Sequence, residues 1–181
     1  MTFDAIVLAG GGSTRLGVDK AALVVDGTTM LDRVLVATAG AVSTVVVGPE
    51  RPTVRPARWT LEDPPAGGPV AGIAAGLAFG SEPVVVVLSC DLPWLSAGDV
   101  TALVDGLGDQ QAETDGFGLR DSAGHEQRLA AAYRRTALTA ALDTLGDPHD
   151  RAVRHLVAGL TIAWTAPTRA GDDVDTWSDL A

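Results

Sequence analysis

Residues 5–20 read Ala5-Ile6-Val7-Leu8-Ala9-Gly10-Gly11-Gly12-Ser13-Thr14-Arg15-Leu16-Gly17-Val18-Asp19-Lys20. The apolar run 5–8 is typical of a strand buried inside a sheet. The glycines after it lack the side chains that would keep a ligand away from the backbone. Backbone N–H groups in such a loop can bind a phosphate, and Arg15 and Lys20, the only lysine in the chain, add positive charge. The stretch therefore predicts a strand followed by a loop for nucleotide phosphates.

The loop differs from two common phosphate-binding motifs. A P-loop ends in Gly-Lys-Ser/Thr, whereas Lys20 follows Asp19 and precedes Ala21. A dinucleotide-binding fingerprint needs a third glycine where this chain has Arg15. A plain connection between a strand and a helix would not need three consecutive glycines beside two cations, because glycine loses more conformational freedom on folding than other residues. We therefore interpret the loop as a nucleotide-binding loop of another type.

Length and composition limit the class of protein. With 181 residues, of which 46% are hydrophobic and 20% charged, the chain is expected to form one globular domain over residues 1–181. No apolar run reaches the roughly 18 residues of a membrane span, and no basic region precedes the first apolar stretch, as it would in a signal peptide. The single cysteine, Cys90, excludes an internal disulfide. We expect a cytoplasmic protein without membrane contact.

The net charge of −10 bears on the partners of the chain. Nucleic-acid binding needs a basic surface, so the acidic balance argues against nucleic acid as a partner. It does not argue against a nucleotide ligand, because a few local cations and a divalent metal can build a positive pocket on an acidic protein.

Apolar runs alternate with segments of helical periodicity. Strands are predicted at residues 4–8, 44–47, 84–88 and 130–133, and more weakly at 58–61 and 160–164. Helices are predicted at residues 30–38, 70–78 and 100–107, the last with Ser96 as its N-cap, and 120–127 is expected to be an exposed loop. The alternation predicts an α/β fold, a three-layer α/β/α sandwich around a mostly parallel, Rossmann-like sheet. Ligands of such folds bind where the parallel strands end.

A second candidate site follows the most apolar strand. Ser89-Cys90-Asp91-Leu92-Pro93-Trp94 comes directly after residues 84–88, so Asp91 is expected at the same edge of the sheet as the glycine-rich loop. A carboxylate there either caps a helix or binds a metal. The predicted cap at Ser96 moves the helix start beyond Asp91. This leaves the carboxylate for a hard cation such as Mg²⁺, which takes one or two carboxylates together with phosphate oxygens.

Two further acidic segments have a functional and a plain interpretation. Glu62-Asp63 precedes a Pro/Gly-rich turn, and either carboxylate would accept hydrogen bonds from the N1–H and N2 amino group of guanine. The alternative is a rigid surface turn with solvated acids. Asp175 either caps a last helical turn or folds back as a second metal ligand.

The histidines and the cysteine are assigned plain roles. His125, His149 and His155 show no metal-ligand spacing and are expected at the surface or in structural contacts. Cys90 is expected to be a buried packing residue rather than a nucleophile.

In this combination and order, the motifs resemble a known family. Residues 8–23, LAGGGSTRLGVDKAAL, are similar to the signature LAGG-x-S-x-R-M-G-x-DK of small nucleotidyltransferases, and most of all to the molybdenum cofactor guanylyltransferases (MobA-like proteins). The later motifs follow in the family's order: Glu-Asp before Gly-Pro-Val-Ala-Gly, then Cys-Asp-Leu-Pro, Ala-Tyr-Arg-Arg and Asp-Val-Asp-Thr. The resemblance extends from Ala5 to Leu180, although Leu16 and Trp177 replace the usual Met and Pro and residues 108–127 match no motif.

The resemblance implies three groups of site residues. Those expected to contact the nucleotide are Leu8, Ala9, Gly10, Gly11, Lys20, Asp63 and Asp91. Lys20, Arg15 and Asp91 are expected to act in catalysis, and Asp91 and Asp175 to bind Mg²⁺. Arg151 and Arg154 either bind an anionic pterin phosphate or form a solvated helix face.

The function that the resemblance implies is transfer of GMP from GTP to the terminal phosphate of (molybdenum-)molybdopterin, with release of pyrophosphate. Because the attacking phosphate oxygen is already anionic, the protein would only need to position the reactants and neutralise charge. The expected partners are GTP, a molybdopterin-type cofactor and, transiently, cofactor-biosynthesis or molybdoenzyme proteins. Alternatives are a CTP-dependent molybdopterin cytidylyltransferase, a phospholactate-type guanylyltransferase, or a non-catalytic GTP-binding adaptor in cofactor insertion.

Overall fold

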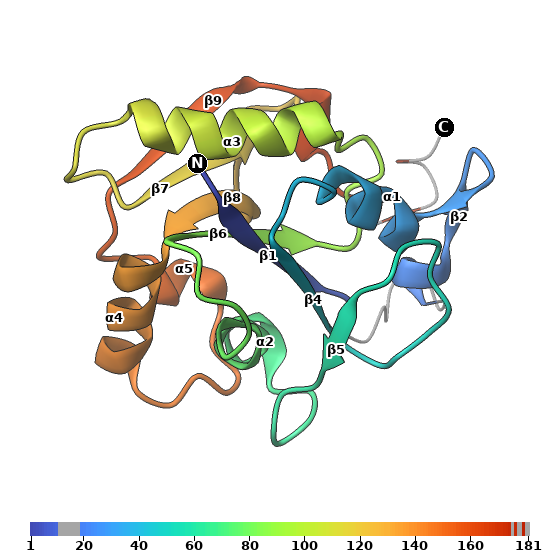
Figure 1. Cartoon of the computed structure of the whole chain (residues 1–181), viewed down its shortest axis with the longest axis horizontal. Coiled ribbons are helices and arrows are strands. Elements are labelled where there is room, and N and C mark those ends of the chain that lie inside the picture. The colour runs from blue at the N-terminus through green and yellow to red at the C-terminus, as the bar shows by residue number, and fades with distance from the viewer. Residues whose placement is uncertain (11–18, 175, 177–178, 180–181) are drawn as a thin grey trace.

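A twisted central sheet with helices on both faces forms the body of the molecule (Figure 1). The computed structural model describes residues 1–10, 19–174, 176 and 179. Within these residues the sheet has seven strands in the order β5-β4-β1-β6-β8-β7-β9. The strands are β1 (Phe3–Leu8), β4 (Ser43–Val47), β5 (Arg58–Thr60), β6 (Val84–Ser89), β7 (Gly116–Arg120), β8 (Glu126–Arg134) and β9 (Ile162–Pro167). A separate short hairpin consists of β2 (Val24–Val25) and β3 (Thr28–Thr29).

The sheet is mostly parallel. β5, β4, β1 and β6 run in one direction, and β7 and β9 share it. Among the described strands of this sheet, only β8 is antiparallel to its neighbours, β6 and β7. This arrangement confirms the predicted α/β fold and its mostly parallel sheet.

The helices divide between the two faces of the sheet. They are α1 (Met30–Ala37), α2 (Gly68–Leu77), α3 (Ala97–Asp109), α4 (Arg135–Leu145) and α5 (Val153–Leu156), with short 3₁₀ turns η1 (Lys20–Ala22) and η2 (Arg169–Gly171). α1 and α3 pack on the face that carries Val84, Val86 and Leu88, whereas α2, α4 and α5 pack on the face of Val85 and Val87. Successive side chains of β6 therefore enter two different cores, which explains its uninterrupted apolar sequence.

Most predicted elements are confirmed, with ends that differ by at most four residues. The N-cap of α3 is Ser96, whose Oγ accepts a hydrogen bond of 3.3 Å from the N–H of Asp99. The Asp99 carboxylate in turn accepts one of 2.9 Å from the N–H of Ser96, which completes a capping box.

The region 108–145 contains two elements that the sequence pattern did not reveal, β7 and α4. β7 includes Gly116 and Gly118, which lower strand propensity. A Cβ atom at Gly116 would lie 2.9 Å from the Tyr133 ring, and one at Gly118 would lie 2.3 Å from the Trp164 ring. The two aromatic rings thus occupy the space of the missing side chains. The predicted loop 120–127 was too long, because its ends belong to β7 and β8.

An ion pair closes the amino-terminal edge of the sheet. Arg135, the first residue of α4, donates a hydrogen bond of 2.7 Å to the carboxylate of Asp4 in β1. The same guanidinium donates to the backbone oxygens of Glu82 (2.7 Å) and Leu77 (3.1 Å). Asp4 is 2% exposed, so this contact offsets the cost of burying its charge.

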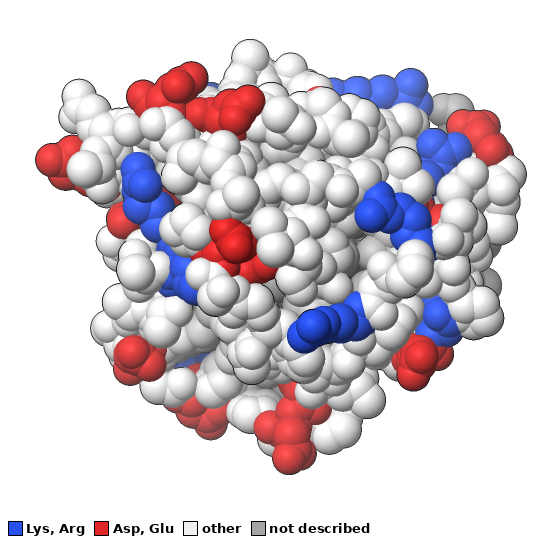
Figure 2. All heavy atoms as spheres, in the orientation of Figure 1, with Lys and Arg blue, Asp and Glu red and all other residues white. Residues whose placement is uncertain are grey.

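In the part of the chain that the structure describes, no helix is both long and apolar enough to cross a membrane. Acidic and basic side chains are interspersed over the face shown in Figure 2.

Candidate active site

A cavity of about 420 Å³ lies at the carboxyl edge of the parallel strands. Residues 8–10 at the end of β1, 19–21 around η1 and 89–91 at the end of β6 form one side of it, and segments between 62 and 72 form another. Leu8 pairs with Val47 on one side and with Ser89 on the other, so β1, β4 and β6 end at one level. The two described ends of the glycine-rich loop, at Gly10 and at Asp19 and Lys20, therefore meet the segment after residue 88, as predicted.

Backbone hydrogen bonds hold the strand ends close together beyond the regular sheet. The N–H of Ala9 donates to Val47 (2.8 Å), and the N–H of Cys90 donates to Leu8 (3.0 Å). Gly48 crosses directly behind Ala9, where a Cβ atom would lie 2.7 Å from the Ala9 carbonyl carbon. The backbones of β1, β4 and β6 therefore lie close together at this edge of the sheet, beside the cavity.

The central charged pair of the cavity is Lys20 with Asp91. Lys20 Nζ lies 3.0 Å from Asp91 Oδ2, and the two side chains are 17% and 14% exposed. Ser89 donates a hydrogen bond to the other carboxylate oxygen of Asp91. Because α3 begins at Ala97 with Ser96 as its cap, the alternative that Asp91 caps this helix is wrong.

A second ion pair, not predicted from the sequence, joins Asp19 to Arg51. Asp19 lines the cavity and also caps η1, since its Oδ1 accepts a hydrogen bond of 3.1 Å from the N–H of Ala21. Arg51 comes from the loop after β4 and its side chain is 17% exposed. The pair thus anchors the turn that carries Lys20. Arg51 is far from the glycine-rich loop in sequence, and no motif marked it.

Cys90 lines the same cavity and is buried. Burial, and then the negative charge of Asp91, raises the pKa of the Cys90 thiol to about 12. The side chain is therefore a neutral thiol at physiological pH, as expected for a packing residue.

The Pro/Gly-rich turn places Glu62 rather than Asp63 against the cavity. Glu62 lines the cavity, and its Oε1 accepts a hydrogen bond of 3.0 Å from the N–H of Ala66. Asp63 precedes a cis peptide bond to Pro64 and is not among the described residues that line the cavity. Its backbone oxygen lies 3.1 Å from Nε2 of His149.

The remaining candidates have diverse positions. Gly11, Arg15 and Asp175 lie outside the described residues. Arg151 lines a second cavity of about 660 Å³ between α4 and α5, and Arg154 is exposed on α5. His125 is exposed and lies 3.0 Å from Asp121.

A metal at this site would depend on few protein ligands. Among the described residues, no group of three or more His, Cys, Asp or Glu side chains is arranged to hold a metal ion. Mg²⁺ commonly keeps several waters and binds one or two carboxylates plus the phosphates of its substrate. Asp91, a carboxylate on the cavity wall, fits that mode of binding.

Comparisons with known proteins agree with this geometry. Residues 5–163 match the family described as MobA-like NTP transferase domain. The chain is 34% identical over 110 residues to the "Probable molybdenum cofactor guanylyltransferase" of Synechococcus elongatus; the match covers 56% of this chain and 57% of the relative. It is also 34% identical over 118 residues to the "Molybdenum cofactor guanylyltransferase" of Burkholderia lata, covering 60% and 58% of the two chains. The chain thus spans a little over half the length of these curated relatives.

A solved structure shows the same fold. It is that of "Molybdopterin-guanine dinucleotide biosynthesis protein A" from Archaeoglobus fulgidus, which superposes with a TM-score of 0.70 at 20% identity and covers 98% of this chain and 94% of that chain. The family match extends over most of the sequence, including the strand ends that build the cavity. The chain therefore belongs to the family of MobA-like NTP transferase domains.

Proposed function

We propose that this protein transfers the GMP moiety of GTP to the terminal phosphate of a molybdopterin-type cofactor and releases pyrophosphate. The observation that carries the proposal is the Lys20–Asp91 pair on the wall of a cavity at the carboxyl edge of the sheet. The names of the two curated relatives support the choice of nucleotide and acceptor.

In the proposed reaction, an anionic oxygen of the acceptor phosphate attacks the α-phosphorus of GTP. The bond between the α-phosphorus and the bridging oxygen breaks, and pyrophosphate leaves with that electron pair. No proton has to be removed from the nucleophile, so positioning and charge neutralisation are the tasks of the protein. Lys20 neutralises the phosphates, with Arg15 assisting, and the backbone N–H groups of Gly10 and Gly11 contact the nucleotide, because the N–H of Ala9 already donates to Val47.

Asp91 is the residue that we propose to hold Mg²⁺, with Asp175 as a second ligand. When bound, the ion would neutralise phosphate charge and polarise the reacting phosphoryl group. Without the ion, Lys20 pairs with Asp91, and this contact holds the carboxylate on the wall of the cavity.

The base is proposed to bind along the turn that follows β5. Glu62 lines the cavity and Asp63 is its neighbour in the chain. Together these carboxylates offer acceptors for the N1–H and N2 amino group of guanine, a pair of donors on one edge that adenine lacks.

The test is pyrophosphate release by the purified protein with Mg²⁺ and a molybdopterin acceptor, comparing GTP, CTP, ATP and UTP. Release with GTP alone is the expected result. Release with CTP would transfer the assignment to a cytidylyltransferase, and GTP binding without release would contradict the proposed acceptor. Lys20→Met, which keeps the length of the side chain but removes its charge, should abolish most of the activity while the protein stays folded.

A further inference from the structure

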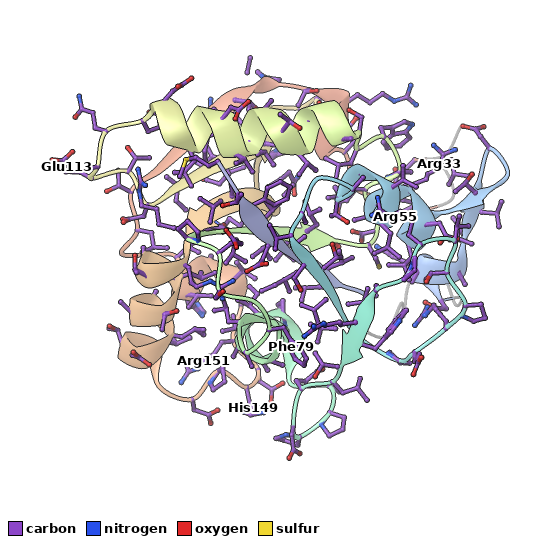
Figure 3. All side chains as sticks on the ribbon, in the orientation of Figure 1. Arg33, Arg55, Phe79, Glu113, His149 and Arg151 are labelled. Atoms are coloured by element: carbon purple, nitrogen blue, oxygen red, sulfur yellow. The ribbon has the colours of Figure 1, made fainter. Side chains whose placement is uncertain are left out.

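The loop between α4 and α5 makes contact with the turn that carries the proposed base-binding carboxylates. Nε2 of His149 lies 3.1 Å from the backbone oxygen of Asp63, a residue 86 positions away in the chain. The N–H of Asp150 donates a hydrogen bond of 2.8 Å to the oxygen of Gly67. Figure 3 shows His149 on this loop, beside α2. Two separate polar contacts therefore join the loop to the turn.

The His149 ring also packs against the turn directly. A Cβ atom at Gly67 would lie 2.5 Å from Cδ2 of His149, closer than two non-bonded carbon atoms can approach. Gly67 has an ordinary backbone φ of −71°, so its missing side chain is explained by the ring, together with Ala71 Cβ at 2.9 Å, rather than by the turn. Residue 67 thus leaves space for the imidazole.

The loop itself orients the ring. Nδ1 of His149 lies 2.9 Å from Oδ1 of Asp147, and the same oxygen accepts a hydrogen bond of 3.0 Å from the His149 N–H. Because both ring nitrogens face oxygen acceptors, the imidazolium form donates to Asp147 and Asp63 at once. The hydrogen bond with Asp147 accordingly raises the pKa of His149.

The turn that His149 contacts is a wall of the cavity. Glu62, Ala66 and Gly68 line the cavity, and Asp63 lies within the same turn. A contact that fixes the carbonyl group of Asp63 also fixes the backbone from which both acidic side chains project. His149 is not itself among the described residues that line the cavity, so any effect on the nucleotide passes through this turn.

We propose that His149 is a positioning residue that ties residues 62–68 to the α4–α5 loop and so sets the affinity and the base selectivity of the nucleotide site. The identity of the selected base rests on the function proposed above; the link between His149, the turn and nucleotide affinity does not. If the role of His149 were only structural, its substitution would change the thermal stability but not the nucleotide affinity or the base selectivity.

The test uses His149→Ala, His149→Gln and, as a matched control, His155→Ala, which removes an exposed histidine from α5. The glutamine amide can still donate a hydrogen bond to the Asp63 oxygen. Dissociation constants for GTP, CTP and ATP are measured by calorimetry with Mg²⁺ and without acceptor, so catalysis is not required. Hydrogen exchange of peptides covering residues 61–70 reports on the turn independently of any nucleotide.

We expect His149→Ala to weaken GTP binding about threefold to tenfold, as for the loss of one hydrogen bond, to reduce the preference for GTP, and to speed exchange in residues 61–70. His149→Gln should recover much of each property, and His155→Ala should behave as the wild type. Gly67→Ala, which crowds the ring and also Ala71 Cβ, should resemble His149→Ala in nucleotide affinity and exchange and gives a second route if that variant folds poorly.

Equal affinities and equal exchange in His149→Ala and His155→Ala would overturn the inference. A wild-type protein without preference for GTP would overturn the proposed function instead. In that case the proposed role of His149 is judged on the affinity for the nucleotide that binds most tightly and on the hydrogen exchange of residues 61–70.

Discussion

Lys20 Nζ lies 3.0 Å from Asp91 Oδ2, and this contact joins the end of the glycine-rich loop to the end of β6 across 71 positions of the chain. A cation and a carboxylate with little exposure are thereby held at the edge where ligands of parallel α/β sheets bind.

The first prediction concerns Asp91. Asp91→Asn keeps the size of the side chain and a hydrogen-bonding oxygen but loses the charge proposed to bind Mg²⁺, so turnover should fall by about a hundredfold or more. Stability should fall by about 1 to 3 kcal/mol, because the pair is largely buried and the neutral amide compensates the Lys20 charge less well. Pyrophosphate release over a range of Mg²⁺ concentrations and thermal unfolding measure the two effects. Asp105→Asn, an exposed carboxylate on α3, is the control. Activity of Asp91→Asn within fivefold of that control would contradict the proposed role.

The second prediction concerns the ion pair between Arg51 and Asp19. If the pair anchors η1, then Arg51→Gln and Asp19→Asn should each lower kcat/KM about tenfold, and the double variant should be no worse than either single one. The amide introduced by Asp19→Asn keeps an oxygen for the Ala21 N–H, so this variant removes the charge without removing the cap. Arg58→Gln, on the exposed side of β5, is the control for surface charge. Additive losses in the double variant would show that the two residues act separately.

A third prediction follows from the buried thiol. Because the pKa of Cys90 is raised to about 12 by burial and by Asp91, the thiolate is scarce at pH 8. A thiol reagent should therefore label the folded protein about a hundredfold more slowly than the denatured protein. Cys90→Ala should cost about 1 kcal/mol of stability through lost packing and leave turnover within about twofold. A large loss of turnover at unchanged stability would give the thiol a chemical role.

The fourth prediction concerns stability at the opposite edge of the sheet. Arg135→Met leaves the carboxylate of Asp4, 2% exposed, without its ion-pair partner and should lower the free energy of unfolding by about 3 kcal/mol. The double variant Arg135→Met with Asp4→Asn should recover part of this loss, because no charge then remains buried. Urea denaturation measures both, with Arg154→Met on the surface of α5 as the control. A loss below about 1 kcal/mol would mean that solvent reaches Asp4.

The fifth prediction is a pH dependence of nucleotide affinity through His149. Its pKa is raised, first by the hydrogen bond with Asp147, with Asp63 and the charge of Asp150 adding to the effect. The charged form of His149 makes both contacts. Its contribution to nucleotide affinity should therefore be fully present below the ordinary pKa of about 6.5 and lost as the pH rises through the raised pKa.

The ratio of the dissociation constants of His149→Gln and wild type isolates this effect, since titration of the nucleotide phosphates affects both proteins equally. The ratio should therefore be largest near pH 6 and decline toward pH 8. A ratio that stays constant over this range would show that the charge of His149 has no part in nucleotide binding.

Local sequence patterns were sufficient to predict those helices and strands whose signal lies within a few residues. The uninterrupted run of residues 84–88 indicated a strand covered on both faces, and Ser96 with Asp99 marked the start of α3. The same patterns placed Asp91 beyond a strand end, and the rule for parallel sheets then brought it to the edge of Gly10 and Lys20.

Other features depend on contacts between distant segments. β7 contains two glycines, and the rings of Tyr133 and Trp164 complete its packing, so no local propensity could identify it. The direction of β8 depends on its pairing with β6 and β7, whereas its alternation of side chains is the same in either direction.

By itself, the sequence determined the α/β class, the buried central strands and the edge where Lys20 and Asp91 meet, because hydrophobic periodicity and loop composition are local properties. Only the tertiary structure decided that Arg51 pairs with Asp19, that Glu62 faces the cavity, and that His149 contacts the turn of Asp63. Each of these contacts joins side chains or backbone groups from separate elements. Their distances follow from how the helices and loops pack on the sheet, which no short stretch of sequence specifies.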